Sequence, residues 1–161
     1  MKLKSKEEIA LIKESAQIVS RTLGLVAENI EPGITTAKLD QMAEEFIRDN
    51  GGVPSFKGYR GFPASLCMSA DAQVVHGFPN DQPLKEGSII SVDCGVYKNG
   101  FHGDHAYTFM VGEVKEEVKQ LLRVTKECLY LGLAEVQAGN RIGHVASTIE
   151  GHAKKYKYGV V

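Results

Sequence analysis

The most informative segment of the sequence is residues 91–109, SVDCGVYKNGFHGDHAYTF. Its Asn-Gly pair at 99–100 favours a two-residue type I′ turn, and β-branched and aromatic residues flank this pair on both sides, so the segment predicts a β-hairpin. With 99–100 at the tip, Gly95 faces Asp104, and Asp93 lies two residues farther along the same face. Asp93 and Asp104 are then diagonal cross-strand neighbours, roughly 7 Å apart at the backbone.

Two aspartates in this arrangement point to a bound cation. Carboxylates this close together in a half-buried sheet repel each other, and their desolvation costs free energy unless positive charge lies between them. One or two divalent metal ions would meet this need, because hard ions prefer oxygen ligands. The alternative is an ordinary hairpin with two aspartates facing solvent, and the hairpin alone leaves both interpretations open.

The composition is that of an ordinary globular protein. The chain has 161 residues, 43% of them hydrophobic and 24% charged, which suits one domain and argues against disorder. Its formal net charge of −1 gives no electrostatic reason to expect nucleic acid or an acidic membrane as a partner. No apolar run approaches the roughly 20 residues of a membrane span, and residues 1–15 lack the apolar core of a signal peptide. The three cysteines are widely spaced and form no disulfide framework, so we expect a cytoplasmic protein.

Apolar periodicity and turn residues predict helices at both ends of the chain and strands between them. Ser5 and Glu8 form a capping box that begins a long helix, which Pro32 and Gly33 end. Thr36 caps a second helix. The predicted strands are 65–69, 74–77, 88–97 and 101–111, and the later helices cover 113–137 and the region of 142–149, followed by the opening of a strand at 158–161. This order predicts an α+β fold.

A second informative segment, residues 58–79, places a histidine at the end of a predicted strand. His76 stands between two valines and a glycine, and a side chain at a strand end can project into a cleft. Imidazole can accept or donate a proton near neutral pH, which suits hydrogen bonding or proton transfer during a reaction. A purely structural hydrogen-bond donor is the alternative for a single histidine.

Four motifs together resemble the type I methionine aminopeptidases, in the same order and with the spacing of that family. These motifs are EPGITTAKLD at 31–40, VVHGFP at 74–79, SVDCG at 91–95 and KNGFHGDHA at 98–106. The similarity runs from about Ser5 to Val161. It implies the pita-bread fold, here its first half, with an antiparallel sheet flanked by helices. The activity that it implies is hydrolytic removal of the N-terminal methionine from nascent polypeptides, in the cytoplasm and in reach of the ribosome.

The resemblance also assigns roles to the residues of the hairpin. Asp93 matches the family's first metal-binding aspartate, and Asp104 matches the aspartate that bridges two ions. His76 matches the histidine that contacts the substrate near its scissile amide and helps to stabilise the tetrahedral intermediate. The implied cofactors are two divalent metal ions, and cobalt, manganese, iron and zinc all tolerate carboxylate and imidazole ligands.

The resemblance further implies a pocket for the methionine side chain. Tyr59 and Phe62 lie where the family lines this pocket, and Phe56 and Cys67 are additional candidates. Aromatic rings and a thiol suit a soft, flexible thioether, which makes favourable sulfur–aromatic contacts. Each of the four residues can equally be part of a plain β-sheet core.

The family completes its metal site with a histidine in a Gly-His-Gly turn and two later glutamates, which have no counterpart in this sequence. We therefore expect residues 1–161 to be one truncated, N-terminal portion of a catalytic domain, with weak activity and self-association through an exposed strand edge. His152 does not replace the absent ligand, because it falls inside the fourth helix. His102 shares the face of Asp104 and is a candidate to orient a metal ligand by a hydrogen bond, whereas His105 points away.

Two other functions remain open from the sequence. The first is a non-catalytic module of the same fold that binds peptides or proteins without metal. Asp93 and Asp104 argue against it, because a buried carboxylate pair without a cation is unfavourable. The second is a proline-specific exopeptidase of the same superfamily, which typically carries an additional N-terminal domain.

Overall fold

The computed structural model describes residues 3–161, which form two compact units, one up to Val114 and the other covering Lys115–Val161. The first unit contains α1 (Lys6–Asn29), α2 (Thr36–Asp49), β1 (Val53–Pro54), the 3-10 helix η1 (Tyr59–Gly61), β2 (Leu66–Ala70), β3 (Ile89–Lys98) and β4 (Phe101–Met110). The second contains α3 (Glu116–Ala134) and α4 (Ile142–Lys155). The organisation of the chain as a single domain stays a prediction.

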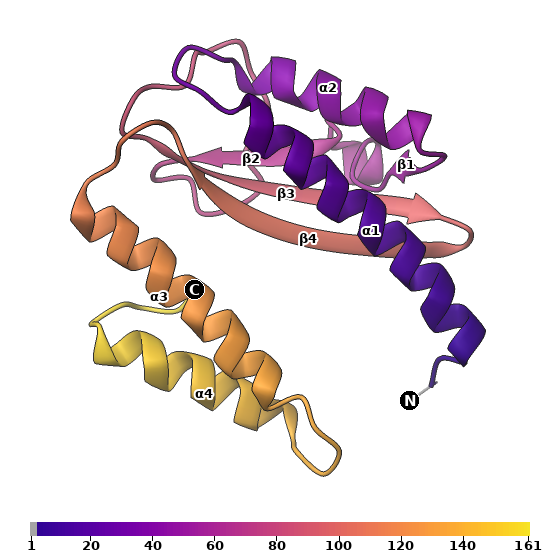
Figure 1. Cartoon of the computed structure of the whole chain (residues 1–161), viewed down its shortest axis with the longest axis vertical. Coiled ribbons are helices and arrows are strands. Elements are labelled where there is room, and N and C mark those ends of the chain that lie inside the picture. Colours follow the sequence, from indigo (N-terminus) through magenta and orange to yellow (C-terminus); the bar gives the residue numbers. More distant parts are fainter. Residues whose placement is uncertain (1–2) are drawn as a thin grey trace. The chain divides into compact units, whose positions relative to one another are not determined.

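The first unit is built on an antiparallel sheet with β3 in the middle (Figure 1). β4 pairs with β3 along its whole length, so β1 and β2 share the other edge of β3. The hairpin has the predicted register, with Gly95 opposite Asp104. Asn99 and Gly100 have φ angles of 51° and 87°, the left-handed values that a type I′ turn requires.

The helices α1 and α2 cover one face of this sheet and form the main core with it (Figure 1). Alternate residues of β3 point toward these helices and are buried: Ile90, Val92, Cys94 and Val96. The intervening residues of β3, Asp93 among them, point to the opposite face, because successive side chains of a strand alternate.

Close packing fixes α1 on the tip of the hairpin. Ser15 is fully buried, and its hydroxyl donates to the carbonyl oxygens of Lys98 (3.3 Å) and Phe101 (3.0 Å). Gly103 lies directly beneath the backbone of Ala16, where a Cβ atom would come within 2.5 Å of the amide nitrogen. The geometry of the hairpin therefore depends on a helix more than 80 residues earlier in the chain.

The structure corrects several predicted boundaries. The capping box at Ser5 is confirmed, but Thr35 is the N-cap of α2 where Thr36 was expected. The helix predicted over 113–137 covers Glu116–Ala134. Residues 74–77 are not a strand, and residues 158–161 also have no regular structure. The short β1 was not predicted as a separate element, because two residues carry no periodicity.

The second unit is a helical hairpin. α3 and α4 pack around Val124, Cys128 and Ala153. His152 lies in α4 as predicted, and its Nε2 is 2.8 Å from Oε2 of Glu127 on α3, which gives it a structural partner. Within residues 3–161, every helix is too short or too polar to cross a bilayer.

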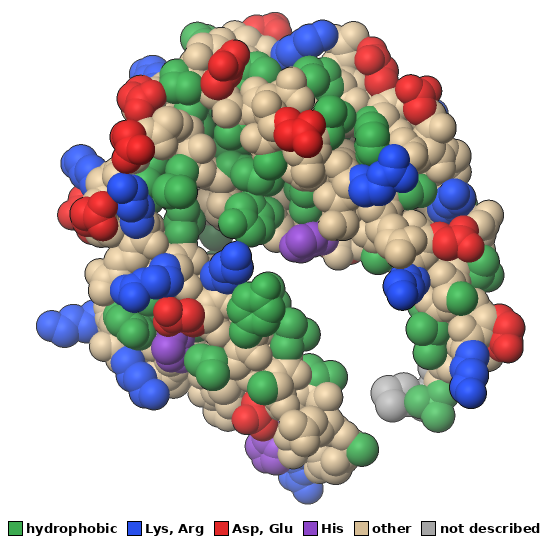
Figure 2. Space-filling view, in the orientation of Figure 1, with side chains coloured by type: hydrophobic (Ala, Val, Ile, Leu, Met, Phe, Trp, Pro, Cys, Tyr) green, Lys and Arg blue, Asp and Glu red, His purple; other side chains and the backbone are tan. Residues whose placement is uncertain are grey.

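Charged side chains are mixed in sign over the face of the first unit that Figure 2 shows. This distribution agrees with the formal net charge of −1 and provides no extended field of one sign.

Candidate metal centre

The structure brings Asp93 and Asp104 together on the face of the sheet that points away from α1 and α2. Asp93 pairs with Ala106 and Gly95 pairs with Asp104, so the two aspartates are diagonal neighbours as predicted. Asp93 is half-buried, whereas Asp104 is exposed. Burial raises the pKa of Asp93 from its usual value, and the nearby charge of Asp104 raises it further.

One oxygen of this pair lacks a partner. Oδ1 of Asp93 is buried and accepts no hydrogen bond from any of the described residues. A buried acceptor without a donor costs about 1–3 kcal/mol, and a cation bound to the carboxylate would remove that cost. The residues present thus fit a hard metal ion, which prefers carboxylate oxygens.

The two carboxylates are only part of a ligand set. Among residues 3–161, no group of three or more His, Cys, Asp or Glu side chains is placed to hold a metal ion. The pair supplies negative charge and oxygen donors from two neighbouring strands, and tight binding of a transition metal depends on further ligands.

His76 lies in an irregular segment beside β2, and the strand predicted at 74–77 is wrong. The cause is Gly77, the residue after His76, which lies against β2. The amide of Gly77 donates to Oγ of Ser69 (3.0 Å), the amide of Met68 donates to the carbonyl of Gly77 (2.9 Å), and a Cβ at Gly77 would collide with the backbone of Met68. His76 itself is exposed, with a left-handed φ of 58°. Its proximity lowers the pKa of Asp93 and so opposes the effect of burial.

Cys67 lies beside the aspartates. It pairs with Asp93 across the β2–β3 ladder and is buried. Burial, together with the charges of Asp93 and Asp104, raises the pKa of the Cys67 thiol to about 11. At neutral pH the side chain is therefore a small, uncharged, polarisable group next to the carboxylates.

Two of the predicted pocket aromatics form a cluster with a third that the sequence did not reveal. Phe56 covers Gly95, where a Cβ would come within 2.7 Å of the ring. Phe62 contacts Phe56 and Phe78 edge to face, with ring centroids 6.5 and 5.2 Å apart. Phe78 is 58% exposed and follows the His-Gly pair, a position that carries no periodic signal. We call Phe56, Phe62 and Phe78 the aromatic cluster.

The other pocket candidate and the two hairpin histidines have different surroundings. Tyr59 is 64% exposed, and the guanidinium of Arg60 lies over its ring. His102 is on the face of Asp104, but its Nδ1 is 2.9 Å from Oγ of Ser55 and its ring packs against Tyr97. His105 shares the opposite face with Cys94, as predicted.

The chain is similar to known proteins over nearly its whole length. Residues 10–161 match the sequence profile of "Metallopeptidase family M24". The chain is 46% identical to the methionine aminopeptidase of Clostridium perfringens over 99% of its own length, and it spans 64% of the length of that relative.

Solved structures give the same result for the fold. The crystal structure of methionine aminopeptidase from Rickettsia prowazekii superimposes with a TM-score of 0.98 at 31% identity, over 100% of this chain and 65% of that one. Prolidase from Pyrococcus furiosus superimposes with a TM-score of 0.85 at 20% identity, over 98% of this chain and 45% of that one, and shows similarity of fold alone. The predicted α+β pita-bread fold is confirmed.

Proposed function

Because the chain belongs to metallopeptidase family M24, we propose that it takes part in the hydrolytic removal of N-terminal methionine from nascent polypeptides. The observation that carries the proposal is the pair Asp93 and Asp104, adjacent on one face of the hairpin, with a buried carboxylate oxygen that has no donor among the described residues. The similarity to methionine aminopeptidases over nearly the whole chain supports the choice of substrate.

We propose that Asp93 and Asp104 hold two divalent ions, with cobalt, manganese, iron and zinc as the candidates. Such ions, when bound, lower the pKa of a water molecule and polarise a carbonyl group. Asp93 contributes a carboxylate with one buried oxygen that accepts no competing hydrogen bond from residues 3–161. We propose that His76, which is exposed and whose charge lowers the pKa of Asp93, donates a hydrogen bond to a peptide near its scissile amide.

The aromatic cluster, Tyr59 and Cys67 are the proposed binding site for the methionine side chain. Phe56 and Cys67 border the carboxylates directly, because Phe56 covers Gly95 and Cys67 pairs with Asp93. A thioether gains favourable contacts with ring edges and does not need a hydrogen-bond partner. These residues orient the side chain and exclude water from it.

We also propose that the protein acts in the cytoplasm, where nascent chains emerge from the ribosome. We propose weak activity for a protein consisting of these 161 residues alone, because they offer two carboxylates and no larger group of metal-binding side chains in the part that the structure describes. We also propose self-association through β4, which pairs only with β3 among the described strands.

Release of methionine from a Met-Gly peptide in the presence of Mn²⁺ or Co²⁺ tests the proposal. We expect slow release by the chain and none by Asp104→Asn, while Asp81→Asn, which removes an exposed carboxylate of the same unit, behaves like the unchanged protein. Equal rates for both variants would contradict the assignment of Asp104. Metal-independent peptide binding without any hydrolysis would favour the non-catalytic module, and rapid release with two bound ions would contradict the weak activity.

A further inference from the structure

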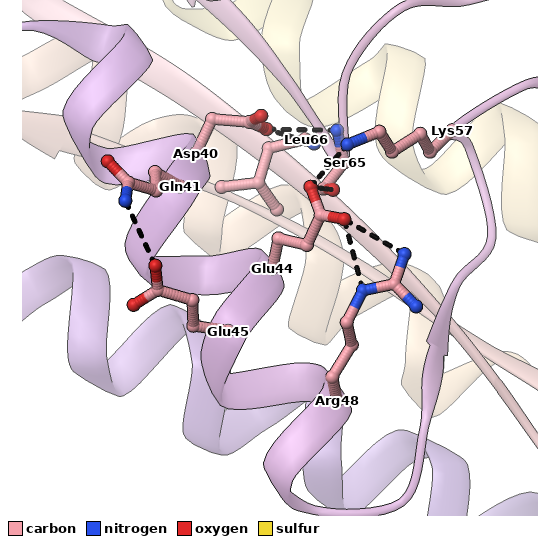
Figure 3. Close-up of polar contacts among 8 residues, drawn as sticks. All are labelled: Asp40, Gln41, Glu44, Glu45, Arg48, Lys57, Ser65 and Leu66. Atoms are coloured by element: carbon pink, nitrogen blue, oxygen red, sulfur yellow. Dashed lines mark hydrogen bonds and ion pairs between the residues drawn. The ribbon is translucent and has the colours of Figure 1, made fainter.

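A single carboxylate joins the two ends of the segment that carries Tyr59 and Phe62. Oε2 of Glu44, on α2, accepts from Nζ of Lys57 (2.6 Å) and from Oγ of Ser65 (3.1 Å) (Figure 3). Lys57 is the first residue of the loop that carries Tyr59 and Phe62, and Ser65 is its last residue. The same oxygen atom therefore closes the loop of residues 57–65.

The position of this carboxylate is itself fixed by α2. Oε1 of Glu44 accepts from both Nε (3.0 Å) and Nη2 (2.9 Å) of Arg48, one turn farther along the helix (Figure 3). One turn earlier, Oδ1 of Asp40 accepts from the backbone amides of Ser65 (3.0 Å) and Leu66 (2.7 Å). The returning end of the loop is thus held by two acidic side chains, and the departing end by Glu44.

Between these ends the loop closes mainly on itself. The amide of Gly58 donates to the carbonyl of Phe62 (2.8 Å), and the amide of Phe62 donates to the carbonyl of Tyr59 (2.9 Å). Gly58, Arg60 and Gly61 have left-handed φ angles of 84°, 49° and 83°, and for Arg60 this conformation is unfavourable. A segment with this backbone needs external anchors to keep one orientation relative to the sheet.

The loop is in contact with the proposed substrate site through Phe62. The ring of Phe62 packs on Phe56 and Phe78, and Phe56 covers Gly95 in the strand of Asp93. We propose that Glu44 is a positioning residue, which clamps both ends of loop 57–65 and so orients the aromatic cluster toward the side chain of the N-terminal methionine. The substrate part of this inference rests on the proposed function.

The expected effect is local order and not global stability. The Lys57 and Arg48 side chains are 44% and 54% exposed, and exposed ion pairs add little to the stability of a fold. The Glu44 side chain, by contrast, is only 19% exposed and accepts from four donor atoms. Loss of its charge frees the departing end of the loop while the sheet and α2 stay folded.

Limited trypsin digestion tests the clamp, because Arg60 is an exposed cleavage site inside the loop. We expect Glu44→Gln to be cut after Arg60 about fivefold faster than the unchanged chain, since cleavage follows the population of the open loop. Glu45→Gln is the matched control: it removes the same charge from the next residue of α2, whose Oε1 accepts from Nε2 of Gln41 (2.9 Å) and not from the loop (Figure 3). Lys57→Arg should preserve the slow cleavage and Lys57→Met should not. Equal cleavage of Glu44→Gln and Glu45→Gln would overturn the clamp.

A second measurement separates the orientation of the cluster from loop order. In protein labelled with 4-fluorophenylalanine, the ¹⁹F signal of Phe62, assigned through Phe62→Leu, should shift in Glu44→Gln and stay in place in Glu45→Gln. A faster-cut loop with an unchanged Phe62 signal would overturn the inference.

Kinetics connect the clamp to the substrate. We expect Glu44→Gln to raise the KM for a Met-Gly peptide and to leave kcat nearly unchanged, because the carboxylates are untouched. A fall in kcat with constant KM would overturn the substrate part. If the unchanged chain releases no methionine, the proposed function fails, and the trypsin and ¹⁹F results still decide whether Glu44 positions the aromatic cluster.

Discussion

The contact between Gly103 and α1 gives a prediction whose size follows from the structure. In Gly103→Ala, the new Cβ would lie 2.5 Å from the amide nitrogen and 2.7 Å from the Cα of Ala16, and 2.7 Å from the carbonyl carbon of Ser15. Such atoms normally approach to about 3.5 Å, so α1 has to move away from β4 by roughly 1 Å. These are backbone atoms of a helix, which cannot rotate away as the end of a side chain can.

The expected loss of stability is at the upper end of the range for overpacking. Extra methylene groups in a well-packed core cost about 1–3 kcal/mol, and the movement of α1 also stretches the hydrogen bonds of Ser15 to the hairpin. We therefore expect Gly103→Ala to lower the free energy of unfolding by about 3 kcal/mol. Since Gly103 precedes Asp104, the hairpin that carries both aspartates is displaced as well.

Hydrogen exchange of the β3 and β4 amides measures this loss in the first unit alone. Gly24→Ala is the matched control, because Gly24 lies inside α1 with no atom near its would-be Cβ. That variant should gain about 0.5–1 kcal/mol through the lower backbone entropy of alanine. If Gly103→Ala is as stable as the unchanged protein while Gly24→Ala is more stable, the close approach of α1 to the hairpin is refuted.

Three further predictions concern ionisable groups. Burial raises the pKa of Asp93, so ionisation of this carboxyl group disfavours the folded state. Without metal, Asp93→Asn should therefore be more stable than the unchanged chain at neutral pH, and the difference in the free energy of unfolding should shrink as the pH falls through the raised pKa. Urea unfolding at several pH values measures this difference. Hydrogen bonds from Lys57 and Arg48 lower the pKa of Glu44 from 4.5 to about 2, so its ordering of loop 57–65 should be complete above pH 4.5 and lost as the pH falls toward 2. The ¹⁹F signal of Phe62 followed through this pH range measures the loss, and the same shift in Glu44→Gln would contradict it. Burial raises the pKa of Cys67 to about 11, so this thiol should resist iodoacetamide at pH 8 until urea unfolds the chain. Rapid alkylation of Cys67 in the native protein would contradict its burial.

The hairpin and its aspartates could be predicted from the sequence because their information is local. The turn residues at 99–100 fix the register, and the register alone decides which side chains share a face with Asp93. The segment at 74–77 failed for the opposite reason. Its apolar residues suggested a strand, but the close approach of Gly77 to β2 draws the segment out of extended geometry and leaves Val74 and Val75 62% and 64% exposed.

The polar anchors of loop 57–65 could not be predicted from the sequence. In the sequence, Glu44 has the pattern of an ordinary charged residue on the outer face of a helix, because its partners Lys57 and Ser65 lie 13 and 21 residues away. Only the folded loop brings them to one carboxylate. The position of Phe78 in the aromatic cluster has the same origin, because it depends on where the irregular segment after β2 passes.

Binding of Mn²⁺, followed by the loss of its free-ion EPR signal, tests whether Asp93 and Asp104 hold a metal ion. We expect weak but measurable binding by the 161-residue chain, loss of that binding in both Asp93→Asn and Asp104→Asn, and unchanged binding in Asp81→Asn. Absence of binding in every protein, or equal binding in all four, would show that the two facing carboxylates of the hairpin do not hold a metal ion.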